Sequence, residues 1–371
     1  MNVPDFFRYA LPHKAPAGKE LIYFPYWRFK GMLFYCVPGQ IKNNFVDVSQ
    51  QAIASSHFPF SLGFRSQTQK LRFAAGEGIF LKPHATKTDL MNRLIERFSA
   101  NLPKPILLHS QIGETISLLY APFYLESRLM DAVLNAPTTS GTAEQIAPLL
   151  SQGQDPTWPI DFIATLCPQC GWDLGGERDA LALHCPNCAV AWMPKGKQLE
   201  RLQTVHIPDR RENTVYLPFW RIQADIDGLA LNNYADLIRV ANLPKVAQPG
   251  WEELPFYFWT PAFKARPQNF LTFATQVTVS QPREAVVAGQ PQGTVRGINM
   301  PLQEAVESLA LILAVCVKPR QRMEETLPHL RISARHALLV YLPFQEGPHE
   351  LIHTGLNLAI SKNLMLHAKN L

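Results

Sequence analysis

Two short cysteine corners lie at the centre of the chain, Cys167-Pro-Gln-Cys170 and Cys185-Pro-Asn-Cys188, with fourteen residues between them. Thiolate sulfurs are soft ligands that suit zinc, and a Cys-x-x-Cys turn brings two of them within reach of one ion. Two such turns supply four sulfurs, which complete a tetrahedral shell and leave no position for water or substrate. The spacing therefore predicts one zinc ion with a structural role.

The residues around the corners predict a small β structure. Pro168 and Pro186 stiffen the turns because the proline ring fixes φ, and Gly171 permits a left-handed backbone after the first corner. Residues 180–185 and 190–192 are expected to form strands that enter and leave the second corner.

This arrangement resembles the rubredoxin-like zinc ribbon over residues 163–195. The resemblance implies zinc binding and a β-hairpin scaffold but no particular activity, because ribbons occur in transcription factors, enzymes and adaptors. Other interpretations of the cysteines are a pair of disulfides, a redox CxxC or an iron site of the same geometry. His184 is interpreted as a strand residue, since four thiolates already fill the shell.

The chain is long enough for two or three domains, with 371 residues of which 47% are hydrophobic. Residues 1–8 lack the features of a signal peptide, and the longest apolar run, residues 309–317, is short of the about twenty residues of a membrane span. A net charge of +5 does not demand a nucleic-acid or membrane partner. Cys36 and Cys316 lie in apolar surroundings, and free thiols beside a thiolate site favour a reducing cytoplasm.

Five segments recur in the same order in the two halves of the chain, which predicts an internal duplication. The pairs are 21–31 with 214–224, 64–74 with 263–274, 89–98 with 303–313, 117–123 with 338–344, and 129–135 with 351–357. The third pair has helical spacing, with Asp89 as an expected N-cap. The predicted fold is therefore α+β, with duplicated sheet-and-helix lobes at 1–137 and 204–371, a linker at 138–162 and the ribbon at 163–195.

Each lobe carries strands of the pattern Tyr-x-Pro-aromatic. A proline cannot donate to a sheet ladder, so sheet edges or bulges are expected at Pro25, Pro122, Pro218 and Pro343. Alternation predicts strands covered on both faces near their start, with Arg28 and Arg221 in equivalent positions. The two arginines either reach solvent or bind an acidic partner. The whole pattern is similar to a group of bacterial zinc-ribbon proteins, a resemblance that implies no particular activity.

A second candidate site is His349-Glu-Leu-Ile-His353, which matches the HExxH pattern of zinc metalloproteases. No Asp or Glu follows His353 to act as a third ligand, and Pro348 and Gly355 leave little room for the required helix. Residues 349–353 and 356–360 are better interpreted as a β-hairpin. The metalloprotease stays an alternative function at this point.

Nucleic-acid binding is the other alternative. It is suggested by cations near the ribbon and by two tryptophans that could stack on bases, although nearby acidic residues dilute the charge. The tryptophans are expected instead to pack against the cysteine corners. The cations are Lys195, Lys197, Arg201, Arg210 and Arg211, and the tryptophans are Trp172 and Trp192.

No catalytic signature other than this HExxH match stands out. The sequence therefore favours a cytoplasmic, non-enzymatic protein that binds one structural zinc and works as an adaptor or assembly component through a protein partner.

Overall fold

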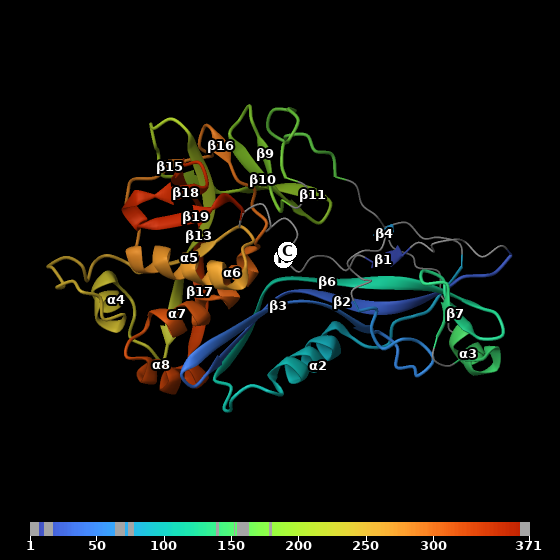
Figure 1. Ribbon diagram of the computed structural model, residues 1–371. Helices are drawn as coiled ribbons and strands as arrows, with labels where there is room; N and C mark the ends of the chain where they lie inside the picture. Colours follow the sequence, from blue (N-terminus) through green and yellow to red (C-terminus); the bar gives the residue numbers. More distant parts are fainter. Residues whose placement is uncertain are drawn as a thin grey trace. The chain divides into compact units, whose positions relative to one another are not determined.

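The computed structural model describes residues 7–10, 18–63, 71–72, 78–138, 141–151, 153, 163–177 and 180–363 (Figure 1). The chain divides into two compact units, the first at 1–31, 46–102 and 114–160 and the second at 32–45, 103–113 and 161–371. The ribbon and the whole of the predicted second lobe belong to the second unit. Within the described residues, no helix has the length and apolar character needed to cross a membrane.

The first sheet has eight strands with the central order β3-β2-β6-β1-β4. Its strands are β1 (Phe7–Ala10), β2 (Ile22–Val37), β3 (Gln40–Gln51), β4 (Leu71–Arg72), β5 (Ile79–Phe80), β6 (Leu108–Leu125), β7 (Leu129–Asp131) and β8 (Ala136–Pro137). Two helices accompany it in the sequence, α2 (Lys87–Ser99) and α3 (Ala143–Leu150).

The second sheet also has eight strands, with the central order β14-β13-β17-β12-β15. Its strands are β12 (Thr204–His206), β13 (Thr214–Asp227), β14 (Phe258–Pro261), β15 (Val287–Ala288), β16 (Thr294–Val295), β17 (Arg331–Glu346), β18 (Glu350–His353) and β19 (Leu358–Ser361). Its helices are α4 (Tyr234–Val240), α5 (Pro267–Ser280), α6 (Leu302–Glu307), α7 (Leu309–Cys316), α8 (Arg320–Thr326), and the 3-10 turns η1 (Leu327–His329) and η2 (Thr354–Leu356).

The strand pairings of the two sheets correspond one to one. β1 and β12 each run parallel to the long strand β6 or β17, and β5 and β16 each run parallel to the start of β2 or β13. The hairpins β7–β8 and β18–β19 extend from equivalent strands. The carbonyl of Ala52 accepts two N–H groups from the segment before α2, and that of Ala262 accepts two from the segment before α6. The α+β class is confirmed, and both sheets are mainly antiparallel.

The repeated tryptophans make the same hydrogen bond in each sheet. The indole N–H of Trp27 donates to the carbonyl of Ala85 at 2.8 Å, just before α2. The indole N–H of Trp220 donates to the carbonyl of Met300 at 3.0 Å, just before α6. Each tryptophan is buried, so each ties a central strand to the start of the helical segment that follows.

The repeated prolines lie in interior strands, so the expectation of edge strands is wrong. On one side of β13, β16 pairs with Val215 and Tyr216, and β14 pairs from Phe219 onward. Pro218 falls between these partners, where its nitrogen has no ladder bond to lose. Its carbonyl on the same side accepts the N–H of Ala262 at 2.9 Å. Pro25, Pro122 and Pro343 lie in the same way, each at a point of its strand where one pairing partner ends and the next begins.

Both faces of the central strands are covered, as the sequence predicts. At the start of β2, Tyr23 and Trp27 on one face and Phe24 and Tyr26 on the other are all buried. Such strands need apolar partners above and below the sheet. In the second unit, α5 packs on β14 and α7 packs on α5.

The C-terminal end of β2 and the N-terminal end of β6 are part of the second unit. Met32, Phe34, Cys36 and Ile112 belong to the same buried core as the residues of β13 and β17. Cys316 joins this core from α7, so both cysteines outside the ribbon are buried. Residues 32–45 and 103–113, which the sequence assigns to the first lobe, therefore pack within the second unit.

The helix boundaries differ in detail from those expected. The N-cap of α2 is Thr86, whose hydroxyl accepts the N–H of Asp89 while the Asp89 carboxylate accepts the N–H of Thr86, so Asp89 is not the cap. The helix expected at 303–313 is divided into α6 and α7 at Ser308. The 64–74 block lies mostly outside the described residues. Within the predicted 138–162 linker, residues 138, 141–151 and 153 are described, and they include α3.

Candidate metal centre

The two cysteine corners are built from similar turns. In the first, the N–H of Gly171 donates to the carbonyl of Cys167 at 2.8 Å, and Gly171 has a φ of +74°. In the second, the N–H of Ala189 donates to the carbonyl of Cys185 at 3.0 Å, and Ala189 has a φ of 54°. The left-handed residue four positions after the first cysteine closes each turn, as predicted for Gly171.

The second corner joins two strands of a three-stranded sheet, and the segment after the first corner pairs with it through a bridge between Gly175 and His184. This sheet and the two corners together are called the ribbon. The strands are β9 (Leu183–Cys185), β10 (Val190–Lys195) and β11 (Gln198–Leu202), paired antiparallel in the order β11-β10-β9. The strands expected on either side of the second corner are confirmed.

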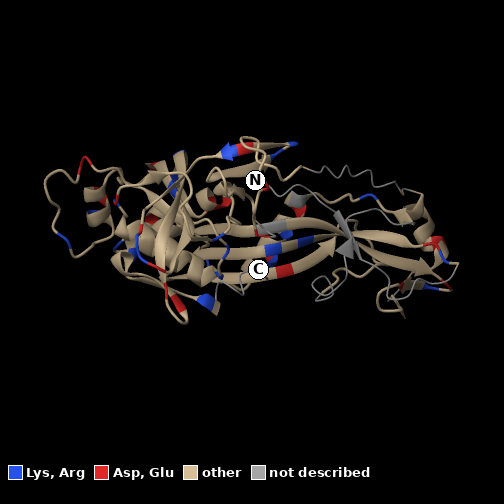
Figure 2. Cartoon of the chain, turned by 90° about the horizontal axis from the view of Figure 1, so that it is seen from above, with Lys and Arg blue, Asp and Glu red and all other residues tan. Residues whose placement is uncertain are grey.

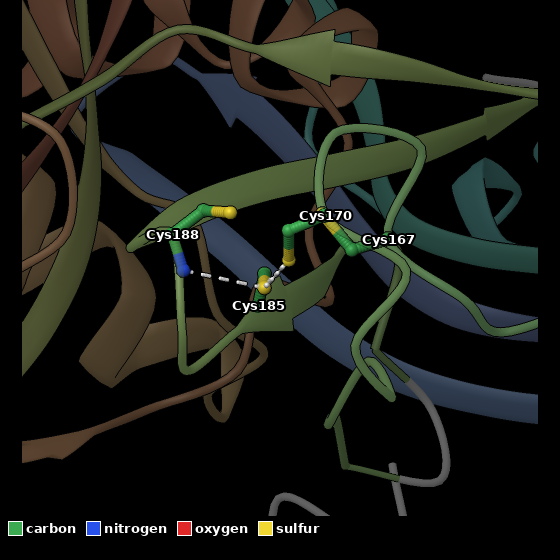
Figure 3. Close-up of side chains that lie close together, drawn as sticks. All are labelled: Cys167, Cys170, Cys185 and Cys188. Carbon is green, nitrogen blue, oxygen red and sulfur yellow. Dashed lines mark hydrogen bonds between the residues drawn. The ribbon is translucent and has the colours of Figure 1, made fainter.

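The four sulfur atoms converge on one point (Figure 3). All four lie within 4.8 Å of one another, and the sulfurs of Cys170 and Cys185 are 3.5 Å apart. Sulfurs about 2.3 Å from a central zinc would be spaced by about 3.8 Å in a tetrahedron. None of the four is in a disulfide, which leaves the group able to hold one metal ion such as zinc.

Burial divides the four ligands into two pairs. Cys167 and Cys185 are buried with Val190 and Trp192 in a small apolar cluster, whereas Cys188 is half-buried and Cys170 is exposed. A metal bound here would therefore be sealed on the side of the ribbon core and face solvent on the side of Cys170.

The thiols influence one another's ionisation. Hydrogen bonds from the side chain of Asn187, from Cys188 and from the backbone of Trp172 lower the pKa of Cys170 to about 6. The hydrogen bond with Cys170, followed by burial, raises the pKa of Cys188 to about 12. The thiolate form is therefore favoured at Cys170 over Cys188.

His184 lies in β9 beside the centre without belonging to its ligand group. Its Nδ1 is hydrogen-bonded to the side-chain amide of Gln290, and burial lowers its pKa to about 4. The ribbon makes further contacts there, because the N–H of Leu181 donates to the carbonyl of Ile298 at 2.6 Å. The sequence interpretation of His184 as a strand residue is confirmed.

The HExxH segment forms the predicted hairpin. Glu350 and His353 lie in β18, which pairs antiparallel with β19 through a turn at η2. His349 precedes β18, and positions four apart on an extended chain are spaced by up to about 13 Å, whereas the HExxH site needs the spacing of one helical turn. His353 is buried, and its Nδ1 accepts the N–H of Leu356 at 3.3 Å. This histidine shapes the turn, as the Asp131 carboxylate does in the equivalent turn of the first sheet.

Lowering the pH from 7 to 5 is expected to destabilise the second sheet partly through His353. Burial lowers the pKa of His353. The pKa of a histidine in the unfolded chain is about 6.5. Below that pH the unfolded chain binds a proton that the folded chain does not, so the free energy of unfolding falls. His353→Asn keeps an acceptor for the turn without titrating. The free energy of unfolding should depend less on pH in this variant, and equal slopes would contradict the assignment.

Arg28 and Arg221 occupy equivalent strand positions but have different partners. The guanidinium of Arg28 donates two hydrogen bonds to the carboxylate of Asp47, at 2.8 and 2.7 Å. That of Arg221 lies over two aromatic rings, 4.9 Å from the centre of Tyr257 and 5.9 Å from that of Trp259. Within the described part of the chain, no carboxylate forms an ion pair with Arg221.

The cations near the ribbon are partly neutralised. Lys195 pairs with Glu200 at 3.0 Å, and Arg211 pairs with Asp209 at 2.7 Å. Trp192 packs behind the corners as expected, whereas Trp172 is 57% exposed, contrary to that expectation. Lysines, arginines and acidic residues are interspersed along the chain in Figure 2.

Comparisons with known proteins give no match for this chain, whether against family models, curated proteins or solved structures.

Proposed function

We propose that the chain is a zinc-stabilised binding protein, without catalytic activity of its own, that works as an adaptor or assembly component in a reducing cytoplasm. The observation that supports this is the convergence of four sulfurs, which would fill the shell of one zinc and leave no open position for chemistry. Among the described residues, these four form the sole group of histidine, cysteine, aspartate or glutamate side chains with metal-ligand spacing.

We infer that the two sheets are duplicates, joined in the sequence by a rubredoxin-like zinc ribbon. Their matching strand orders support this, and so do the equivalent hydrogen bonds of Trp27 and Trp220. Duplication provides two similar frames on which surface residues can diverge. The different partners of Arg28 and Arg221 are an example of such divergence.

The second sheet supplies the cationic surface that would meet an acidic protein partner. Arg221 lies over Tyr257, Arg283 lies 4.5 Å from the ring centre of Tyr234, and Lys245 donates to the Tyr234 hydroxyl at 3.1 Å. Aromatic faces hold cations without cancelling their charge. Arg28 is the weaker candidate, because Asp47 already neutralises it.

Replacing Arg221 with glutamate is expected to reduce recovery of the protein partner at least tenfold, because a favourable charge contact becomes a repulsive one. Proteins that co-purify with the tagged, zinc-loaded chain would be quantified by mass spectrometry. Lys42→Glu makes the same charge change at an exposed site on β3 and should retain the partner. Equal recovery from Arg221→Glu, or a chain that purifies alone with measurable turnover, would refute the adaptor function.

Nucleic-acid binding is the second candidate function, and the exposed Trp172 on the first corner is the observation that favours it. In that case affinity for single-stranded DNA or RNA would fall steeply with salt and would be lost in Trp172→Ala. Flat titrations would leave the adaptor function as the sole candidate.

A further inference from the structure

A groove of about 510 Å³ lies beside α5 in the second compact unit. One side of α5 contributes residues at helical spacing, and the rest of the lining comes from β3, the end of α7, Lys318 and the first residue of α8. The volume is within the range of small-molecule sites. The groove contains none of the cysteine ligands and none of the residues of the cationic surface around Arg221.

The lining combines an apolar strip with uncharged polar groups. Leu271, Ala314 and Val315 supply apolar surface from α5 and α7. Amide and hydroxyl side chains of α5, together with Asn43 of β3, can donate and accept hydrogen bonds. None of the described residues that line the groove is acidic.

Two cations give the groove its charge, Lys318 and Arg320. Both are exposed, and no described carboxylate forms an ion pair with Lys318. The Nε of Arg320 lies 3.3 Å from a carboxylate oxygen of Glu324, and the same oxygen accepts the N–H of Gly39 at 2.7 Å. Glu324 is thus shared, so net positive charge remains at this end of the groove.

Two threonines of α5 belong to the lining, Thr272 and Thr275. The hydroxyl of Thr272 donates to the carbonyl of Gln268 one turn earlier, at 2.8 Å. The Oγ1 of Thr275, one turn from Leu271 on the same helix, is buried and has no hydrogen-bond partner among the residues that the structure describes.

We propose that this groove binds a small organic anion with an apolar body, in which a carboxylate or phosphate head lies at Lys318 and Arg320. The apolar body lies along Leu271, Ala314 and Val315. Charge-assisted hydrogen bonds to two cations fix the head, and the apolar strip excludes charged bodies.

The test is calorimetric titration of the full zinc-loaded chain with octyl phosphate, octanoate and octylammonium, which share one tail and differ in charge. The two anions are expected to bind with a stoichiometry of one, and octylammonium is expected not to bind. Lys318→Ala should weaken octyl phosphate about tenfold, as loss of one charge-assisted bond predicts. Thr272→Trp, at an exposed position of α5, should block the groove and abolish binding.

Lys42→Ala is the matched control, because it removes the same charge from an exposed residue of β3. Lys42 lies between the lining residues Ile41 and Asn43, so its side chain is on the opposite face of the strand. Equal weakening by Lys42→Ala and Lys318→Ala, equal binding of octylammonium, or no binding of either anion would overturn the proposal. Vesicles containing phosphatidylglycerol separate two sources of the anion. If the vesicles retain the wild-type chain but not Lys318→Ala, the anion is the head group of a lipid. If octyl phosphate binds but the vesicles do not retain the chain, the anion is a free molecule.

Discussion

Joint replacement of Cys170 and Cys188 by serine is expected to release the zinc ion and unfold the ribbon, while the first sheet keeps its core. The two substitutions remove one ligand from each corner and avoid the most buried sulfurs, so the loss reports on the metal rather than on packing. Structural zinc can contribute about 10 kcal/mol or more to a small domain, which the ribbon's small apolar cluster cannot replace. Metal analysis and hydrogen exchange along β9, β10 and β11 provide the measurement.

The effect should extend to the rest of the second unit only where the ribbon contacts it. The bond from Leu181 to Ile298 and the ion pair between Glu177 and Arg296 at 3.3 Å would be lost with the ribbon fold. Cys316→Ala, which alters a buried thiol outside the ribbon, should retain one zinc. Retention of zinc by the double variant, or loss of the first sheet in the same unfolding step, would contradict this account.

Trp27→Ala and Trp220→Ala are each expected to cost about 3–5 kcal/mol of unfolding free energy, mainly in the sheet that contains the residue. Each change leaves a cavity at a central strand and removes the bond that holds the segment before α2 or α6. Trp→Phe should cost less, since most of the ring volume stays and one hydrogen bond of about 1 kcal/mol is lost.

Hydrogen exchange resolved by strand, with chemical denaturation, would measure both variants. Trp172→Ala is the control, because its side chain is exposed and its removal should change stability by less than about 0.5 kcal/mol. Equal destabilisation of both sheets by either variant would show that the sheets do not unfold separately. A cost below about 1 kcal/mol at one tryptophan would show that the two positions are not equivalent.

Local chemistry made the metal centre and the repeated strands predictable from the sequence. Cysteine spacing specifies ligands within one small segment, and the Tyr-x-Pro-aromatic blocks could be aligned directly. Partners supplied by distant strands could not be predicted, because nothing near Arg28 or Arg221 in the sequence indicates Asp47 or Tyr257. The two-residue strands β5 and β16 give no periodic signal, and without them the junctions at Pro25 and Pro218 looked like sheet edges.

Some missed features did carry a readable signal. Thr86 precedes Asp89 by three residues, the spacing of a capping box, and this pattern identifies the N-cap better than an acidic residue alone. Ser308 interrupts an apolar helical stretch, and its hydroxyl donates to the carbonyl of Ala305 at 2.6 Å where the helix is divided. The groove beside α5 had no such signal, because it depends on β3 packing within the second unit.

X-ray absorption at the zinc edge of the purified full-length chain tests the central claim most directly. We expect one zinc per chain, surrounded by four sulfur atoms at about 2.3 Å and by no nitrogen or oxygen ligand. A chain that takes up no zinc, binds two ions, or shows nitrogen or oxygen in the first shell would contradict it.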